Sequence, residues 1–317
     1  MSQPSGVKGH FVGADYHQRL LADRVRVDAF RRALEELVQP GMVVADVGTG
    51  TGLLAFLARR AGARKVYAIE LAPIIRAARR VCAGNGFEGI EFLEADSLLL
   101  TLPEPVDLVV CECMGHFVVT DEMLPVLEDL RRHLKPGGVV CPRGIRLWLA
   151  PARFPTFRSV ADWDDPVEGI DFSALRRAAL NKAYILNTYA EGLIGPPVLF
   201  REIKPIEMSE RETTTLDGTL ALELREAGPL TGVLGWFDAE LSPSVTLSTA
   251  PGIDTHWGQM LFPLERLPMQ RGDRLRFTLR LHFEPATATS SWQWRGDLLR
   301  QGEVVASSVH STEDPWG

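Results

Sequence analysis

A chain of 317 residues with 45% apolar and 24% charged residues has the composition of a globular protein with one large domain or two ordinary ones. The formal net charge of −7 argues against a nucleic-acid-binding surface. No apolar run approaches the length of a membrane span, and the first residues lack a signal-peptide core. We therefore expect a cytoplasmic protein without a nucleic-acid or membrane partner.

The four cysteines form no C-x-x-C pair and have no histidine-rich neighbourhood. They are typical of reduced thiols in a cytoplasmic protein, and we expect no metal site. They are Cys82, Cys111, Cys113 and Cys141.

Apolar strand patterns alternate with amphipathic helix patterns in the part of the chain before Pro142. This alternation predicts an α/β fold with a doubly wound parallel sheet. The expected strands and helices span residues 43–47, 53–61, 65–70, 73–84, 90–94, 106–112, 121–134 and 138–141.

A glycine-rich turn follows the first strand, with Asp46 before it and Gly48, Gly50 and Gly52 within it. Such glycines let the backbone turn sharply and let a ligand lie against it. The second strand ends in Glu70, where an acid accepts hydrogen bonds from ribose hydroxyls. The G-x-G-x-G spacing suits a nucleoside without phosphates and indicates S-adenosylmethionine. The alternatives are a nicotinamide- or flavin-binding unit, or a purely structural turn.

Two further polar residues, Asp96 and Ser97, follow the strand at 90–94. They are placed to contact the adenine amino group, although either could be an ordinary turn acid or cap.

Glu112 lies at the end of the fourth strand and is expected to point into the same crevice as the glycine turn. A buried carboxylate at this position requires a cationic partner. The alternative is an acid at the strand end that faces solvent. Asp121 and Glu122 follow Thr120, which resembles a helix N-cap, and acids in a first helical turn are common.

After Pro151 the chain consists mostly of short strands with alternating apolar residues, as in 274–283, and of turn signals. A polar insertion at about 164–189 is expected to be helical. The sequence therefore predicts a second, β-rich domain.

Three separated motifs resemble those of the protein arginine methyltransferases, and the resemblance covers nearly the whole chain. Glu112-Cys113-Met114-Gly115 and Met123-Leu124 match the "double-E" hairpin, which clamps a substrate guanidinium. Thr255-His256-Trp257 matches the family's Thr-His-Trp motif, and 17–26 resembles its N-terminal helix.

The resemblance implies a Rossmann-like class I methyltransferase domain at 35–145, preceded by a helical segment at 1–34. A β-barrel-like substrate domain at 146–317 would carry the dimerisation arm, about 164–189, so that a homodimer is expected. It further implies that Arg26 binds the cofactor carboxylate and that Asp23 pairs with His256 across the domain boundary.

On the substrate side, the resemblance implies that the second clamp residue is Asp121 or its neighbour Glu122. Aspartate replaces the family's glutamate at 121, while Cys113 and His116 stand where the family usually has aromatic residues. We expect the acceptor pocket to be completed by Met114, His116, Met123 and Trp257.

We therefore expect an enzyme that transfers a methyl group from S-adenosylmethionine to nitrogen, in an arginine of a protein or peptide or in a guanidino small molecule. One alternative is a small-molecule N- or O-methyltransferase of a bacterial natural-product pathway. A second is a cofactor-binding regulatory protein without turnover.

Overall fold

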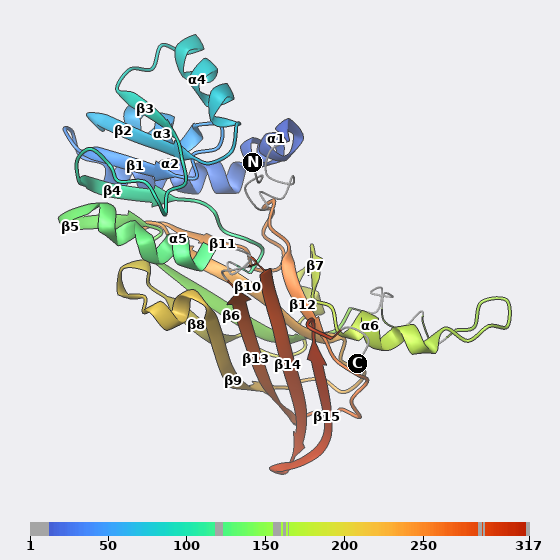
Figure 1. The fold of residues 1–317 in the computed structure, drawn as a ribbon. Coiled ribbons are helices and arrows are strands. Elements are labelled where there is room, and N and C mark those ends of the chain that lie inside the picture. Colours follow the sequence, from blue (N-terminus) through green and yellow to red (C-terminus); the bar gives the residue numbers. More distant parts are fainter. Residues whose placement is uncertain are drawn as a thin grey trace.

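The computed structural model describes residues 13–117, 123–154, 160, 163, 165–284, 287 and 289–314. Figure 1 shows a domain built on a parallel sheet, two antiparallel sheets beside it, and the short helix α1 near the junction between them. The predicted α/β domain and the β-rich second domain are both confirmed.

The first domain is a five-stranded parallel sheet in the order β3-β2-β1-β4-β5. The strand order reverses between β1 and β4, and in such sheets ligands bind beyond the carboxyl ends of the strands at this point. The apolar side chains of the central strands are buried on both faces, which explains their continuous Val, Ile and Ala runs. The strands are β1 (Val43–Val47), β2 (Lys65–Glu70), β3 (Ile90–Glu94), β4 (Val106–Cys111) and β5 (Leu134–Cys141).

Three helices of this domain lie close to the expected ranges 53–61, 73–84 and 121–134, although the last ends at His133 in a 3-10 turn, and the N-terminal helix differs more. The expected continuous helix over 17–26 is interrupted at Asp23, whose side chain accepts a hydrogen bond from the Arg26 N–H and so caps a second helix. The helices are α1 (Ala14–Ala22), α2 (Arg24–Leu37), α3 (Leu53–Arg60), α4 (Ile75–Gly84), α5 (Met123–Asp129) and the 3-10 helix η2 (Leu130–His133).

The second domain consists of two antiparallel sheets. One has the order β7-β12-β10-β6-β8 with β11 paired to β10, and the other has the order β15-β14-β13-β9. The strands are β6 (Gly144–Ala152), β7 (Tyr184–Leu186), β8 (Val198–Ile203), β9 (Thr215–Glu223), β10 (Gly232–Glu240), β11 (Thr246–Ser248), β12 (Gln259–Pro263), β13 (Arg274–Glu284), β14 (Thr289–Arg300) and β15 (Glu303–Ser311). Short 3-10 helices η5 (Ala190–Gly192), η6 (Pro205–Glu207) and η7 (Glu210–Thr213) connect them.

The insertion at about 164–189 is less helical than expected. Among its described residues, only η4 (Ser173–Leu175) and α6 (Arg176–Leu180) are helical, and 184–186 instead form β7 at the edge of a sheet. The segment that carries α6 extends away from the antiparallel sheets (Figure 1). Tyr184 and Ile185 favour a strand because aromatic and β-branched side chains fit a pleated surface.

One large buried apolar core continues from the first domain into the second. Phe117 lies in the segment after β4 and is fully buried. Its ring centroid is 5.9 Å from that of Phe262 and 6.2 Å from that of Trp292. Burial of such a side chain stabilises a fold by roughly 1.5–3 kcal/mol. The segment after β4 is therefore held between the two domains, which fixes the position of Glu112.

Candidate active site

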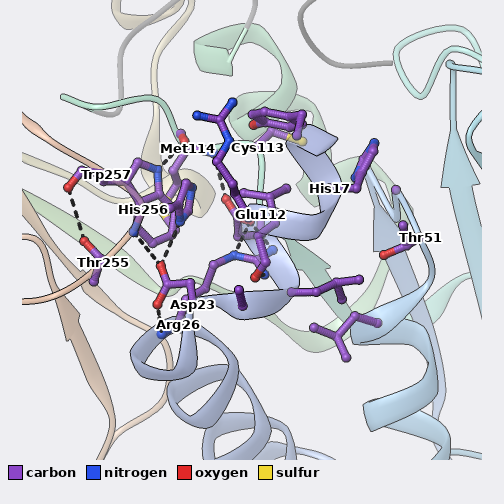
Figure 2. Close-up of a pocket in the computed structure, with 18 of the residues that line it drawn as sticks. His17, Asp23, Arg26, Thr51, Glu112, Cys113, Met114, Thr255, His256 and Trp257 are labelled. Atoms are coloured by element: carbon purple, nitrogen blue, oxygen red, sulfur yellow. Dashed lines mark hydrogen bonds and ion pairs between the residues drawn. The ribbon is translucent and has the colours of Figure 1, made fainter. Parts of the chain in front are cut away.

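A cavity of about 1090 Å³ lies where α1, the carboxyl ends of β1 and β4, and the loop before β12 meet. The parallel register aligns Val47 with both Ile69 and Cys111, so the three strands end at one level. The glycine turn, Glu70 and Glu112 are thereby brought to the same crevice, as predicted. Figure 2 shows side chains from α1, the glycine turn, the end of β4 and the loop before β12 converging on this cavity.

The glycine turn has a backbone that only glycine adopts readily. Gly48, Gly50 and Gly52 have φ values of +74°, +54° and +89°, all in the left-handed region. Gly48 and Gly50 line the cavity, while Gly52 precedes α3 as its N-cap. A Cβ atom at Gly48 would lie 2.4 Å from the Cys113 sulfur. The glycine turn is therefore tightly enclosed by the segment that follows β4.

Two acids support this turn from different sides. Glu70 lines the cavity, and its carboxylate accepts hydrogen bonds from the N–H groups of Gly50 at 3.0 Å and Ala72 at 2.8 Å. Asp46 is buried beneath the turn, where one of its oxygens accepts from the hydroxyl of Thr49 and from the N–H of Ala55 at 2.9 Å. Burial raises the pKa of Asp46 to about 7.

The cation that the buried Glu112 requires comes from the chain itself. Arg26 directs its Nε and Nη2 atoms at the same oxygen of Glu112, with the Nε contact at 2.7 Å. Both side chains are less than a tenth exposed. The other oxygen of Glu112 accepts only a long 3.3 Å hydrogen bond from the Met114 N–H among the described residues. One edge of the carboxylate thus remains available for a ligand.

Asp23 and His256 form the pair that the resemblance implied (Figure 2). The Nδ1 atom of His256 lies 2.8 Å from an Asp23 oxygen, which also accepts from the His256 backbone N–H. Burial by itself raises the pKa of Asp23, but the hydrogen bonds from the His256 ring and from two backbone N–H groups outweigh it and lower the pKa. Asp23 is therefore an anion that keeps the proton of His256 on Nδ1.

Two hydrogen bonds connect the segment after β4 to the loop before β12. The indole N–H of Trp257 donates to the carbonyl of Met114 at 2.8 Å, and the backbone N–H of Gly258 donates to Nδ1 of His116 at 2.9 Å. The rings of His256 and Trp257 lie 3.8 Å apart between their centroids. Together with the Arg26 and Asp23 contacts, these bonds join α2, the end of β4 and the loop into one rigid frame.

The other residues predicted for the site divide into three groups. Met123 lines the cavity, as does Cys113, whose pKa is raised by the thiol of Cys111. Asp96 and Ser97 do not line the cavity, and Asp96 instead accepts a hydrogen bond from the Leu98 N–H within a turn. Their contact with adenine stays a prediction. Asp121 and Glu122 lie outside the described residues.

Helix α1 contributes cavity residues that the sequence did not indicate as site residues, and His17 and Tyr16 are two of them. His17 is buried, and its ring lies against the turn, since a Cβ atom at Gly50 would be 3.1 Å from its Cε1 atom. Tyr16 also lines the cavity, and burial together with the charge of Glu112 raises its pKa to about 12. The sequence signal was the match of 17–26 to the N-terminal helix of the family, which assigns no role to His17 or Tyr16 and equally fits two ordinary helix residues.

The residues at the turn fit S-adenosylmethionine. Gly48 and Gly50 leave room that any Cβ atom would fill, Glu70 offers a carboxylate at the ribose position, and no phosphate-binding cation is required. Within the described residues, no group of three histidine, cysteine or acidic side chains could hold a metal ion. None of the described helices is long and apolar enough to cross a membrane. The fold and the site define an S-adenosylmethionine-dependent methyltransferase.

Comparison with known proteins places the chain more narrowly. Residues 44–138 match the model of a methyltransferase domain, and residues 146–290 match that of the arginine methyltransferase oligomerization subdomain. Protein arginine N-methyltransferase PRMT10 of Oryza sativa subsp. japonica is 33% identical over 300 residues, covering 82% of this chain and 79% of the relative. Protein arginine N-methyltransferase 6 of Xenopus laevis is 31% identical over 264 residues, covering 78% of each. The chain belongs to the protein arginine N-methyltransferase family.

Solved structures agree with this assignment. Protein arginine methyltransferase 10 of Arabidopsis thaliana superimposes with a TM-score of 0.81 at 26% identity, covering 95% of this chain and 99% of that one. The Trypanosoma brucei PRMT1 enzyme-prozyme complex with AdoHcy gives a TM-score of 0.85 at 24% identity, with the same coverage, and supports the fold.

Proposed function

We propose that this enzyme transfers the methyl group of S-adenosylmethionine to a guanidinium nitrogen of an arginine in a protein or peptide. The observation that carries the proposal is Glu112, a buried carboxylate at the end of β4 with one edge facing the cavity next to the glycine turn. A carboxylate in this position binds a guanidinium through charge-assisted hydrogen bonds. Relatives that are 33% and 31% identical to this chain are named protein arginine N-methyltransferases.

The chemistry requires activation of the acceptor, because a guanidinium is protonated and delocalised and has no free lone pair. When bound, the cofactor supplies an electrophilic methyl group on a sulfonium. Glu112 draws positive charge toward the nitrogen that it binds and leaves another nitrogen more nucleophilic. The rigid frame around Glu112 holds that nitrogen in line with the methyl group, and such positioning contributes much of the acceleration.

Charge balance argues for a second acid. Arg26 already neutralises Glu112, so an incoming guanidinium would leave one uncompensated positive charge in a buried site. A second carboxylate balances this charge and so removes the free-energy cost of burying it unpaired. The proposal assigns this role to Asp121 or Glu122, which the sequence places shortly before α5 (Met123–Asp129).

The Asp23–His256 pair supplies a proton acceptor. Because Nδ1 donates to Asp23, the Nε2 atom of neutral His256 has a free lone pair. When the new N–CH₃ bond forms and the S–CH₃ bond breaks, the methylated nitrogen must lose a proton. His256 is positioned on the cavity wall to accept it, and the adjacent anion stabilises the imidazolium that results.

We also propose that the enzyme acts as a homodimer. The insertion that extends from the sheets presents exposed apolar residues, with Val167 60%, Ile170 58% and Phe172 37% exposed. Exposed apolar residues that cluster on one segment are typical of a protein interface. The match of 146–290 to an oligomerization subdomain supports this part of the proposal.

Incubation with labelled S-adenosylmethionine tests the function directly. The acceptors are an arginine-containing peptide, its lysine-substituted twin, free arginine, and a lysate separated into protein and small-molecule fractions. The proposal expects label on the arginine peptide and in the protein fraction, and none on the lysine twin. Label confined to the small-molecule fraction would replace the protein acceptor with a metabolite.

A further inference from the structure

We infer that His116 is a specificity-determining residue: a neutral hydrogen-bond donor in the acceptor pocket that binds a carbonyl oxygen of a peptide acceptor. This inference rests on the proposed function. It names the feature of the substrate, beyond the guanidinium, that the site recognises.

The tautomer of His116 follows from a single contact. The Gly258 N–H donates to Nδ1 at 2.9 Å, and Nδ1 can accept this bond only if it carries no proton. A neutral ring then has its proton on Nε2. Protonation of Nδ1 would place two N–H groups against each other, so the contact itself opposes the imidazolium form.

The surroundings of His116 act in the same direction. Burial lowers the pKa of His116, and the neighbouring His256, which is paired with Asp23, lowers it further. His116 is therefore neutral at physiological pH. The two rings hold their protons on opposite nitrogens: Nδ1 of His256 donates to Asp23, which leaves its Nε2 as an acceptor, whereas Nε2 of His116 is the donor.

The Nε2–H group of His116 is available to a ligand. His116 lines the cavity with Glu112, and its side chain is only partly buried. Nε2 has no hydrogen-bond partner in the part of the chain that the structure describes, and it is not among the fully buried polar atoms. A donor that faces a cavity in this way is satisfied by water or by an acceptor atom of the bound substrate.

The chemistry of the donor selects the group that it binds. A guanidinium has five N–H donors and no acceptor, so His116 cannot bind the group that is methylated. It needs an oxygen on another part of the substrate. Every arginine within a peptide has backbone carbonyls at a fixed number of bonds from the guanidinium, whereas agmatine has the same guanidino chain without any oxygen. The site is thereby matched to peptide arginine.

Two substitutions separate the two nitrogen atoms of His116. His116→Asn places an oxygen near the Nδ1 position, retaining the bond from Gly258 but removing the Nε2 donor. His116→Gln reaches the Nε2 position with an amide that can donate, and loses the bond from Gly258. His282→Asn, on β13 and outside the active site, is the matched control.

We expect His116→Asn to raise KM for the arginine peptide about 5- to 10-fold, the effect of one lost neutral hydrogen bond, with kcat little changed. His116→Gln should recover most of this loss, and agmatine should show no difference among the variants. The ¹⁵N chemical shifts of wild-type His116 between pH 6 and 8 should show a protonated Nε2 and an unprotonated Nδ1.

Four outcomes overturn the inference. Equal effects of His116→Asn on peptide and agmatine would show that His116 only supports the frame. A protonated Nδ1 would remove the donor assignment. If wild-type enzyme methylates no guanidino compound, the proposed function fails and the inference fails with it. If wild type methylates the peptide and the variants match it, only the inference fails.

Discussion

Replacement of Glu112 by glutamine tests the acceptor site most sharply, because it keeps the shape of the side chain and removes its charge. The amide oxygen can still accept from Arg26 Nε, which now donates at 2.7 Å. It cannot balance the charge of a bound guanidinium or draw charge toward one of its nitrogens. We expect kcat to fall about 10²- to 10³-fold, the loss typical for one electrostatic group in an active site.

Cofactor binding should change little in Glu112→Gln. Glu112 contacts Arg26 and the Met114 N–H, whereas the turn is held by Glu70 and Asp46. We expect the Kd for S-adenosylhomocysteine to stay within a few-fold. The free energy of unfolding should fall by roughly 1–3 kcal/mol, because the buried Arg26 loses its counter-ion but keeps hydrogen bonds.

Single-turnover kinetics on an arginine peptide, with calorimetric cofactor binding and urea unfolding, measure all three quantities. Glu94→Gln is the control, since Glu94 also ends a strand of the parallel sheet and pairs with Arg76, but does not line the cavity. Its turnover should match wild type. Wild-type turnover in Glu112→Gln would refute the clamp, whereas equal loss of turnover and cofactor binding would indicate a collapsed site.

Three further substitutions test the supporting residues. Asp46→Asn probes pH dependence: the folded-state pKa of Asp46 is raised to about 7, so its contribution to stability is full below about pH 4 and is lost as the pH rises through 7. Between pH 5 and pH 8 wild type should therefore lose about 2.7 kcal/mol of stability through Asp46, since the two pH units from 5 to 7 each cost about 1.36 kcal/mol, and Asp46→Asn should not show this loss. Urea unfolding at both pH values measures the difference, and an unchanged pH dependence would contradict the assignment. Gly50→Ala should weaken S-adenosylhomocysteine binding about 5- to 30-fold, because φ is +54° there and the new Cβ atom would lie 3.1 Å from the His17 ring. Gly41→Ala is the control and should not weaken it, since φ is +91° but no atom lies within 4 Å of the new Cβ atom. Asp23→Asn should retain the cap of α2 but lower kcat about 10- to 100-fold, and wild-type kcat would exclude a role of the Asp23–His256 pair in turnover.

Much of the parallel-sheet domain could be predicted because its signals are local. Strands 43–47, 65–70 and 90–94 were placed at the observed residues from apolar runs between turn signals. The break at Asp23 is not predicted by the match of 17–26 to one helix, although aspartate is a good N-cap. The insertion at 164–189 was predicted as helical from its polar composition, but edge pairing with β12 makes 184–186 a strand. Such tertiary pairing overrides local propensity.

The residues of the site also divide into those that local sequence signals indicate and those that only the tertiary structure shows. Gly48, Gly50, Glu70 and Glu112 could be placed at one edge because strand ends in a parallel sheet converge. The pairing of Arg26 with Glu112 joins residues 86 positions apart, and no local pattern indicates it. The bond from Gly258 to His116 spans 142 positions and depends on how the two domains pack. Such contacts come from the tertiary structure alone.

Fragmentation mass spectrometry of an arginine peptide after incubation with enzyme and S-adenosylmethionine tests the central claim most directly, because it identifies the atom group that receives the methyl. We predict a methyl group on the guanidino side chain of arginine with wild-type enzyme, and none with Glu112→Gln. A methyl group on any other side chain or on the peptide terminus, or an unmodified peptide in the presence of enzyme that binds cofactor normally, would contradict the account.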